Sequence, residues 1–159
     1  AQDWVDSRGY RGLYDFLLWF PAKKTSRLNT SSYAFVNFRN SEDALRFRQD
    51  FHLSRFSSNE DDASSTRWPL SIAVAKVQGF AKNYIRFHHL MDELSPTRCQ
   101  PYFDPDSVSK LSQETKEVAA ASPARPSNKL QDSPCTTLII RNLPPSINSH
   151  EGAREWLDR

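Results

Sequence analysis

The sequence predicts an α/β fold, an α+β sandwich whose four-stranded antiparallel sheet carries helices on one face. Four segments have the apolar or alternating composition of strands: 13–20, 31–38, 70–77 and 137–142. Apolar residues recur at helical spacing in 41–51 and in 80–91. The order of these elements, and a partial repeat between 1–7 and 153–159, indicate a circularly permuted or fragmentary copy of the domain.

Length and composition allow one modest hydrophobic core. The chain has 159 residues, of which 38% are hydrophobic and 12% aromatic, and its net charge is +2. Residues 8–48 are more basic, with eight Lys or Arg against three Asp or Glu. The two cysteines, Cys99 and Cys135, favour a reducing compartment, so we expect an intracellular protein, nuclear or cytoplasmic. The apolar run 16–20 is too short to span a bilayer, which predicts no membrane partner.

Turn and strand signals define the N-terminal elements. Residues 1–7 have the composition of the end of a helix, and the glycines of 8–12 mark a turn. The strongly apolar segment 13–20 is predicted to be a strand that Pro21 ends. Residues 22–30 form a polar, basic loop before the next strand.

Helix and strand signals alternate in the middle of the chain. Asn40 or Ser41 is expected to cap the helix 41–51, whose first turn holds acidic residues that suit the helix dipole. Residues 52–67 are rich in serine and have an acidic centre, which predicts a surface insertion. The strand 70–77 follows and ends before a glycine.

Composition divides the chain into three parts. Residues 1–103 hold most of the predicted strands and the amphipathic helix 80–91, and are predicted to be the domain without its first strand and most of its first helix. Residues 104–135 are rich in Ser, Ala, Pro, Lys and Gln and contain no aromatics, so they are predicted to be a flexible linker with at most a short helix at 110–121. Residues 136–159 are predicted to form a strand and a helix.

A partial repeat explains this order. The segments AQDWVDS at 1–7 and AREWLDR at 153–159 share Ala, Trp and Asp at matched positions. The simplest interpretation is one period of a tandem repeat, in which 136–159 is the first strand and helix of the next copy. The linker is long enough for the strand to fold back, so we expect 136–159 to complete the sheet of 1–103.

The segment SSYAFVNF at 31–38 carries the strongest functional pattern. Its last six positions match the RNP-1 signature of RNA recognition motifs, [K/R]-G-[F/Y]-[G/A]-F-V-x-[F/Y], whereas serines replace the basic residue and the glycine. On a strand, Tyr33, Phe35 and Asn37 share one face. Two exposed rings on an open sheet suit the stacking of unpaired bases, although an ordinary aromatic strand would have the same alternation.

Four further motifs accompany the octamer: TTLIIRNLP at 136–144, GLYDFL at 12–17, AKVQG at 75–79 and PYF at 101–103. Together they resemble the C-terminal RNA recognition motif of the Mei-two-like meiosis regulators. The resemblance covers most of 1–103 and 136–159. It implies a ferredoxin-like four-stranded antiparallel sheet of order β-α-β-β-α-β, single-stranded RNA as the partner, and a role in meiosis or development. Ile139 stands where this family's second motif usually offers a stacking aromatic.

The resemblance and the expected alternation together give a set of candidate RNA-binding residues. Tyr33 and Phe35 would stack bases, with Trp19 as a third ring. Asn37 and Arg141 would contact base edges. The loop residues Lys23, Lys24 and Arg27 would contact phosphates, and Lys76 would make a main-chain or base contact. The complete set is Tyr33, Phe35, Asn37, Trp19, Leu17, Ile139, Arg141, Lys76, Lys23, Lys24 and Arg27. In this arrangement Asp15 shares the open face, while Tyr14, Phe16 and Leu18 face the helices.

Two alternatives to RNA binding remain. The same fold can serve as a protein-interaction module, which the helix 80–91 lying across Tyr33 and Phe35 would indicate. The chain can also be an incomplete fragment of a tandem array. No enzyme is predicted, because the four histidines lie in no metal-binding or catalytic pattern and no glycine-rich phosphate loop is present. We accordingly expect no cofactor, metal or small-molecule substrate.

Overall fold

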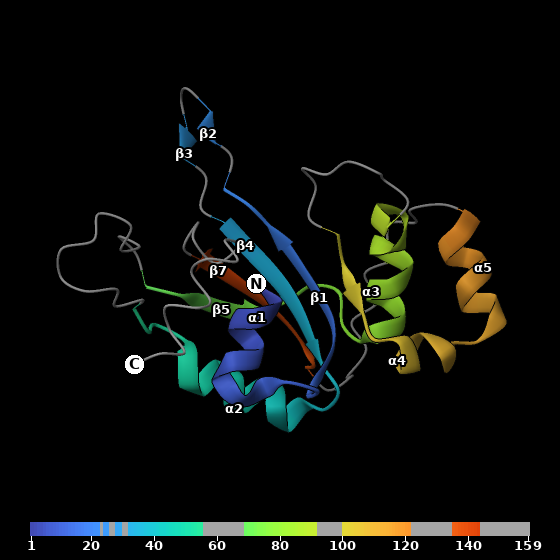
Figure 1. Ribbon diagram of the computed structural model, residues 1–159, viewed down its shortest axis with the longest axis horizontal. Coiled ribbons are helices and arrows are strands. Elements are labelled where there is room, and N and C mark those ends of the chain that lie inside the picture. The colour runs from blue at the N-terminus through green and yellow to red at the C-terminus, as the bar shows by residue number, and fades with distance from the viewer. Residues whose placement is uncertain are drawn as a thin grey trace.

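The computed structural model of the chain describes residues 1–22, 24–25, 28–29, 32–55, 69–91, 100–121 and 135–143. At its centre is a five-stranded antiparallel sheet in the order β5-β7-β4-β1-β6 (Figure 1). The strands are β1 (Tyr14–Phe20), β4 (Ser32–Phe38), β5 (Ser71–Val74), β6 (Tyr102–Phe103) and β7 (Thr137–Leu143). Between β1 and β4, the short hairpin of β2 (Lys24–Thr25) and β3 (Leu28–Asn29) projects beyond the sheet.

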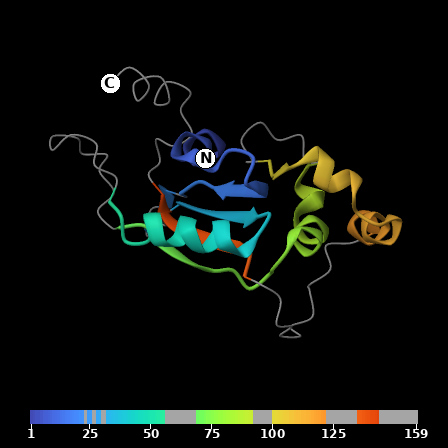
Figure 2. The same ribbon diagram turned by 90° about the horizontal axis from the view of Figure 1, so that it is seen from below.

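Five α-helices accompany the sheet in the described part of the chain. They are α1 (Gln2–Val5), α2 (Ser41–Phe51), α3 (Phe80–Phe87), α4 (Pro105–Ser109) and α5 (Gln113–Ala121). A π-helical turn, Asp6–Tyr10, continues α1, and a 3-10 turn, His88–Met91, continues α3. Figure 2 shows α3, α4 and α5 grouped apart from α1 and α2.

Strand β7 lies inside the sheet, although it comes last in the described chain. It pairs with β4 on one side and with β5 on the other. Phe35 is opposite Ile139 in the first pairing, and Ala73 is opposite Ile139 in the second. Residues 144–159, where a further helix is predicted, lie outside the described residues.

The first face of the sheet packs against α1 and α2. The Asn40 side chain caps α2 by accepting a hydrogen bond from the backbone N–H of Asp43 at 2.8 Å, as the sequence predicts. The capped helix buries Phe47, whose ring meets that of Tyr10 edge-to-face with centroids 4.9 Å apart. These side chains join Phe38 and the other buried residues of the sheet in one core.

The second face is partly covered by α3, so the prediction of four strands with helices on one face is wrong. Phe80, Tyr84 and Phe87 form a stripe at helical spacing, and this stripe packs against Phe16 and Phe103. The reason is that β1 is apolar on both faces, and a strand of that kind needs a cover on each side. The added strand β6 pairs with the free edge of β1.

Residues 104–135 are not a continuous linker, because α4 and α5 occupy 105–109 and 113–121. Asp104 caps α4 through the backbone N–H of Ser107 at 2.9 Å. Val108, Leu111 and Ala119 then pack against the core beneath α3. This packing is hard to predict from the sequence, because small or aliphatic side chains make it in a segment that has no aromatics. Residues 122–134 lie outside the described residues.

Candidate nucleic-acid interface

Part of the second face is left accessible along β4, β7 and β5. We call this area the open strip and define it by the residues that the strand register places there: Tyr33, Phe35, Ser71, Ala73, Ile139 and Arg141. Arg141 is exposed and the other five are half-buried. On the opposite face, Ile72 and Ile140 are each 1% exposed, so the two faces of these strands differ clearly.

Tyr33 stands at one end of the open strip and belongs to a cluster of three rings. It stacks on Phe20, with centroids 4.8 Å apart and an interplanar angle of 22°. It meets Phe35 edge-to-face at 5.9 Å. Both contacts lie in the range of favourable aromatic pairs and support the ring from two neighbouring side chains. Tyr33 is therefore a positioned, half-exposed platform.

A β-bulge in β1 places two predicted contact residues on the wrong face. The pairing of β1 with β4 shifts between Tyr14 and Phe16, so Asp15 is an extra residue in the strand. The alternation beyond Asp15 is thereby reversed. Leu17 and Trp19 are only 5% and 7% exposed and belong to the core beneath α1 and α2. The prediction that they line an open face is wrong.

The same bulge moves two other side chains to the second face. Leu18 is opposite Phe35 and Phe16 is opposite Asn37, so both share the face of the open strip rather than that of α1 and α2. Only Tyr14, which precedes the bulge, keeps its predicted place in the first core.

Helix α3 reaches the edge of the open strip through Phe87. The Phe87 ring stacks on Phe16 with centroids 5.6 Å apart and an interplanar angle of 12°. It also contacts Phe35 at 5.7 Å with a tilt of 33°. Phe35 is thus in ring contact with Phe87, Tyr33 and Phe20.

Asn37 is not available to a base, contrary to prediction. It is 2% exposed, and its Nδ2 donates to Asp15 Oδ1 at 2.7 Å. Its Oδ1 accepts from the hydroxyls of Thr136 at 2.9 Å and Thr137 at 2.6 Å. The amide is therefore fully engaged in joining β1, β4 and β7.

The same network attaches the N-terminal end of α3 to the sheet. Thr137 Oγ1 accepts hydrogen bonds from Asn83 Nδ2 at 3.0 Å and from the backbone N–H of Gly79 at 3.1 Å. Gln78 also contributes, since its Oε1 accepts from the backbone N–H groups of Thr136 and Thr137, each at 2.9 Å. We call Asp15, Asn37, Thr137 and Asn83 the anchor network.

Burial makes the Asp15 carboxyl a weaker acid than usual. Removal from water raises the pKa of its carboxyl above the ordinary value of 3.8, and the hydrogen bond from Asn37 and the charge of Arg39 oppose this rise only in part. A buried carboxylate with two compensating partners is suited to a structural role in the bulge, where it fixes the position of Asn37.

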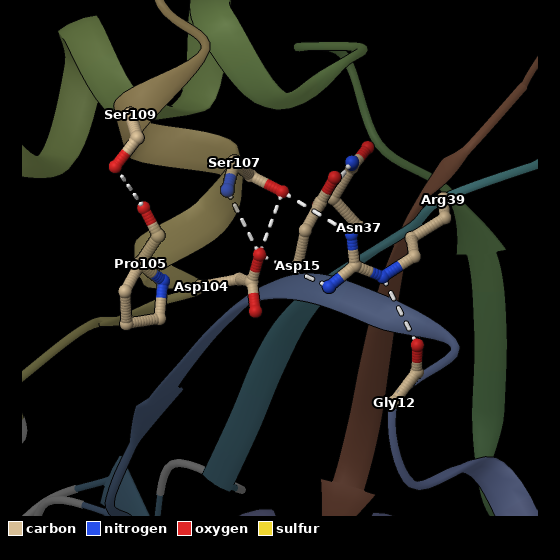
Figure 3. Close-up of polar contacts among 8 residues, drawn as sticks. All are labelled: Gly12, Asp15, Asn37, Arg39, Asp104, Pro105, Ser107 and Ser109. Atoms are coloured by element: carbon tan, nitrogen blue, oxygen red, sulfur yellow. Dashed lines mark hydrogen bonds and ion pairs between the residues drawn. The ribbon is translucent and has the colours of Figure 1, made fainter.

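Arg39 joins the end of β4 to α4 near this network (Figure 3). Its guanidinium forms an ion pair with Asp104 at 3.0 Å and donates to the backbone carbonyl of Gly12 at 3.0 Å. It also donates to Ser107 Oγ at 3.3 Å. The Asp104 backbone N–H in turn donates to the carbonyl of Asp15 at 2.8 Å, so the turn before β1 and the start of α4 are held together.

The predicted basic contacts are only partly placed by the structure. Lys76 is exposed and follows β5. Lys24 lies in β2 of the projecting hairpin, and Lys23 and Arg27 lie outside the described residues. Of the predicted set, the structure brings together Tyr33, Phe35, Ile139 and Arg141.

The sequence does not identify Phe20 and Phe87 as the side chains beside Tyr33 and Phe35, although the protein-interaction alternative places the helix 80–91 across these two rings. The Phe80, Tyr84, Phe87 spacing did signal an apolar helix face, but the spacing does not say which surface that face covers. Phe20 was missed because a bulge cannot be seen in an alternation of apolar side chains.

Comparison of the chain with known protein families, curated proteins and solved structures finds no match. The described residues include no group of three or more His, Cys, Asp or Glu side chains arranged to hold a metal ion. None of the helices in the described ranges has the length and apolar character of a membrane span.

Proposed function

We propose that this chain binds single-stranded RNA through the open strip. The pairing of Tyr33 with Arg141 carries the proposal, because a half-exposed ring on β4 lies directly opposite an exposed guanidinium on β7. An aromatic face stacks an unpaired base, and a neighbouring cation contacts a phosphate or a base edge. Half-buried Ile139 and Ala73 extend this surface with apolar contacts suited to a sugar or a base.

The order of the elements supports the same proposal. Counted from β7 and then onward from α1, and leaving the β2–β3 hairpin aside, the order is β7, α1, β1, β4, α2, β5. This is the β-α-β-β-α-β order that the family resemblance implies. The two strands whose sequences resemble the family's RNA-binding motifs, β4 and β7, are neighbours. A circularly permuted RNA recognition motif, extended by β6, α3, α4 and α5, would have this arrangement.

One observation favours a second function, a protein-interaction module. Phe87 contacts Phe35, so α3 occupies part of the face that an RNA recognition motif uses for bases. Among the described residues, the ring contacts of Tyr33 are with Phe20, on which it stacks, and with Phe35, and none is with α3. We therefore favour RNA binding centred on Tyr33 and Arg141.

Fluorescence anisotropy with a labelled single-stranded RNA of random sequence tests the proposal. We expect Tyr33→Ala to weaken binding by about 1–3 kcal/mol, because one stacked base is lost, whereas Tyr33→Phe keeps the ring and the affinity. Arg141→Ala should weaken binding and reduce its salt dependence. Arg48→Ala, which removes an exposed arginine from α2 on the far side of the sheet, is the matched control and should bind like wild type.

Two results would contradict the proposal. Folded wild-type protein that binds no single-stranded RNA at low salt would favour the protein-interaction module. Equal losses for Arg141→Ala and Arg48→Ala would show that binding follows overall charge rather than the open strip.

A further inference from the structure

We propose that the surface against which α1 packs is a docking site at which residues 153–159 exchange with residues 1–7. We call this surface the helix site and define it by Tyr14 and the α2 residues Phe47 and Phe51. The second occupant is the chain's own segment 153–159. This inference concerns the first face of the sheet rather than the open strip, so it stands independently of RNA binding.

The contacts that hold α1 beside α2 are the first argument (Figure 1). The Trp4 ring meets that of Phe51 edge-on, with centroids 5.6 Å apart. Val5 is 1% exposed and belongs to the core. The carboxylate of Asp6 accepts a hydrogen bond from the Tyr14 hydroxyl at 2.7 Å. Three successive residues therefore attach this segment through a ring contact, an apolar contact and a hydrogen bond.

The segment 153–159 repeats the residues that make these contacts. Within residues 1–7, four positions are buried or half-buried and the other three are exposed. Matched in order, the four inward pairs are Ala1 with Ala153, Trp4 with Trp156, Val5 with Leu157 and Asp6 with Asp158. Three of these pairs are identical, and the fourth is apolar in both segments. Every inward requirement of the helix site is thus present twice in the chain.

The two segments differ clearly only where residues 1–7 face water. Gln2 and Ser7 are exposed, and their counterparts are Arg154 and Arg159. Substitutions at solvent-facing positions have small effects on stability, whereas those at packed positions have large ones. A likeness confined to the inward positions is therefore what two segments that fit one surface should show.

The topology gives both segments the same place. Residues 153–159 follow β7 in the chain and residues 1–7 precede β1, so either segment can supply the helix between these two strands. Leu143, the last residue of β7, lies in the same core cluster as Val5. The nine residues 144–152 span about 30 Å when extended, which is enough to reach the helix site. Because this segment is tethered, its high effective concentration favours it over a second molecule.

The short length of α1 makes exchange feasible. It spans four residues, Gln2–Val5. A helix of this length is not stable in isolation, so α1 depends on its packing in the helix site. A segment with the same inward residues therefore competes for that packing on similar terms.

Fluorine NMR of the full chain labelled with 5-fluorotryptophan tests the exchange. The chain has four tryptophans, and Trp156→Phe identifies the resonance of Trp156. Trp4→Ala removes the ring by which residues 1–7 hold the helix site. In this variant we expect the Trp156 resonance to move away from its wild-type position and to lose most of its shift between H₂O and D₂O, as a buried ring does.

Two substitutions in the Trp4→Ala background serve as the block and its matched control. Leu157→Asn places a polar amide at an inward position, so the Trp156 resonance should return to its solvent-exposed value. Arg154→Asn introduces the same residue at the position matched to exposed Gln2, so the resonance should stay in the buried environment.

Urea unfolding gives an independent readout. Leu157→Asn alone should leave wild-type stability nearly unchanged, because residues 1–7 fill the helix site. In the Trp4→Ala background it should raise the unfolding equilibrium constant by about tenfold or more, because neither segment then fits the site. If Trp4→Ala is unfolded at the working temperature, Val5→Ala, which deletes fewer atoms, takes its place in both experiments.

Three results would overturn the proposal. The first is a solvent-exposed Trp156 resonance in folded Trp4→Ala. The second is an equal effect of Leu157→Asn on the stability of wild type and of Trp4→Ala. The third is a Trp156 resonance that moves only as protein concentration rises, with sedimentation as a dimer, which would assign the site to a second copy of the chain.

Discussion

At the scale of single residues, one extra residue in β1 decides which side chains are available. The bulge at Asp15 sends Leu17 and Trp19 into the core and brings Phe16 and Leu18 to the second face. Strict alternation predicts the reverse, and a bulge has no reliable sequence signal. By contrast, the alternation of Tyr33 and Phe35 along β4 could be predicted, because that strand contains buried residues on one face and half-buried rings on the other.

Two buried carboxyls give opposite contributions to the pH dependence of stability. Burial raises the pKa of Asp15, so the folded state binds its proton more tightly than the unfolded state does, and this group destabilises the fold increasingly as pH rises through the ordinary value of 3.8. Burial also opposes ionisation of Asp104, but hydrogen bonds from Ser107 and the charge of Arg39 outweigh it and lower the pKa. Asp104 therefore adds stability that is lost as pH falls.

We expect Asp15→Asn and Asp104→Asn to change the pH profile in opposite directions. As pH rises from about 3 to 7, the free energy of unfolding of wild type should fall relative to Asp15→Asn and rise relative to Asp104→Asn. Urea unfolding at a series of pH values measures both differences, and each variant serves as the control for the other. Parallel profiles for all three proteins would contradict the burial of Asp15.

At the scale of elements, β7 is the strand on which the sheet depends. It separates β5 from β4, and its Leu138 and Ile140 lie in the core beneath α1 and α2. The sequence allowed this placement to be predicted, since the order of elements lacked a first strand. It did not allow α4 to be predicted, and it indicated α5 only as a short helix at 110–121 within a linker, because Val108, Leu111 and Ala119 give a weak apolar pattern within a polar segment.

Adjacent isoleucines of β7 provide a matched test of this placement. Ile140 is 1% exposed, so Ile140→Ala should lower the free energy of unfolding by about 2–5 kcal/mol through loss of burial and a residual cavity. Ile139→Ala removes the same atoms from the half-buried open strip and should cost clearly less. Urea denaturation followed by circular dichroism compares the two. Equal small losses would place β7 outside the cooperative unit.

At the scale of the whole molecule, the second face divides into a covered part and an open part. β1 and β6 lie beneath α3, whereas the open strip crosses β4, β7 and β5. Under the proposed function, the net charge of +2 predicts an RNA affinity that comes more from stacking than from general electrostatic attraction. The sequence indicated the aromatic strand, but the position of α3 depends on tertiary packing that helical spacing alone does not specify.

The most direct test of the open strip as an RNA platform is chemical-shift mapping of isotope-labelled protein titrated with a short single-stranded RNA. We predict that the shifted resonances gather at Tyr33, Ala73, Ile139 and Arg141, while those of α2 on the opposite side of the sheet stay unchanged. Shifts confined to α2, or no shifts at saturating RNA, would contradict the account.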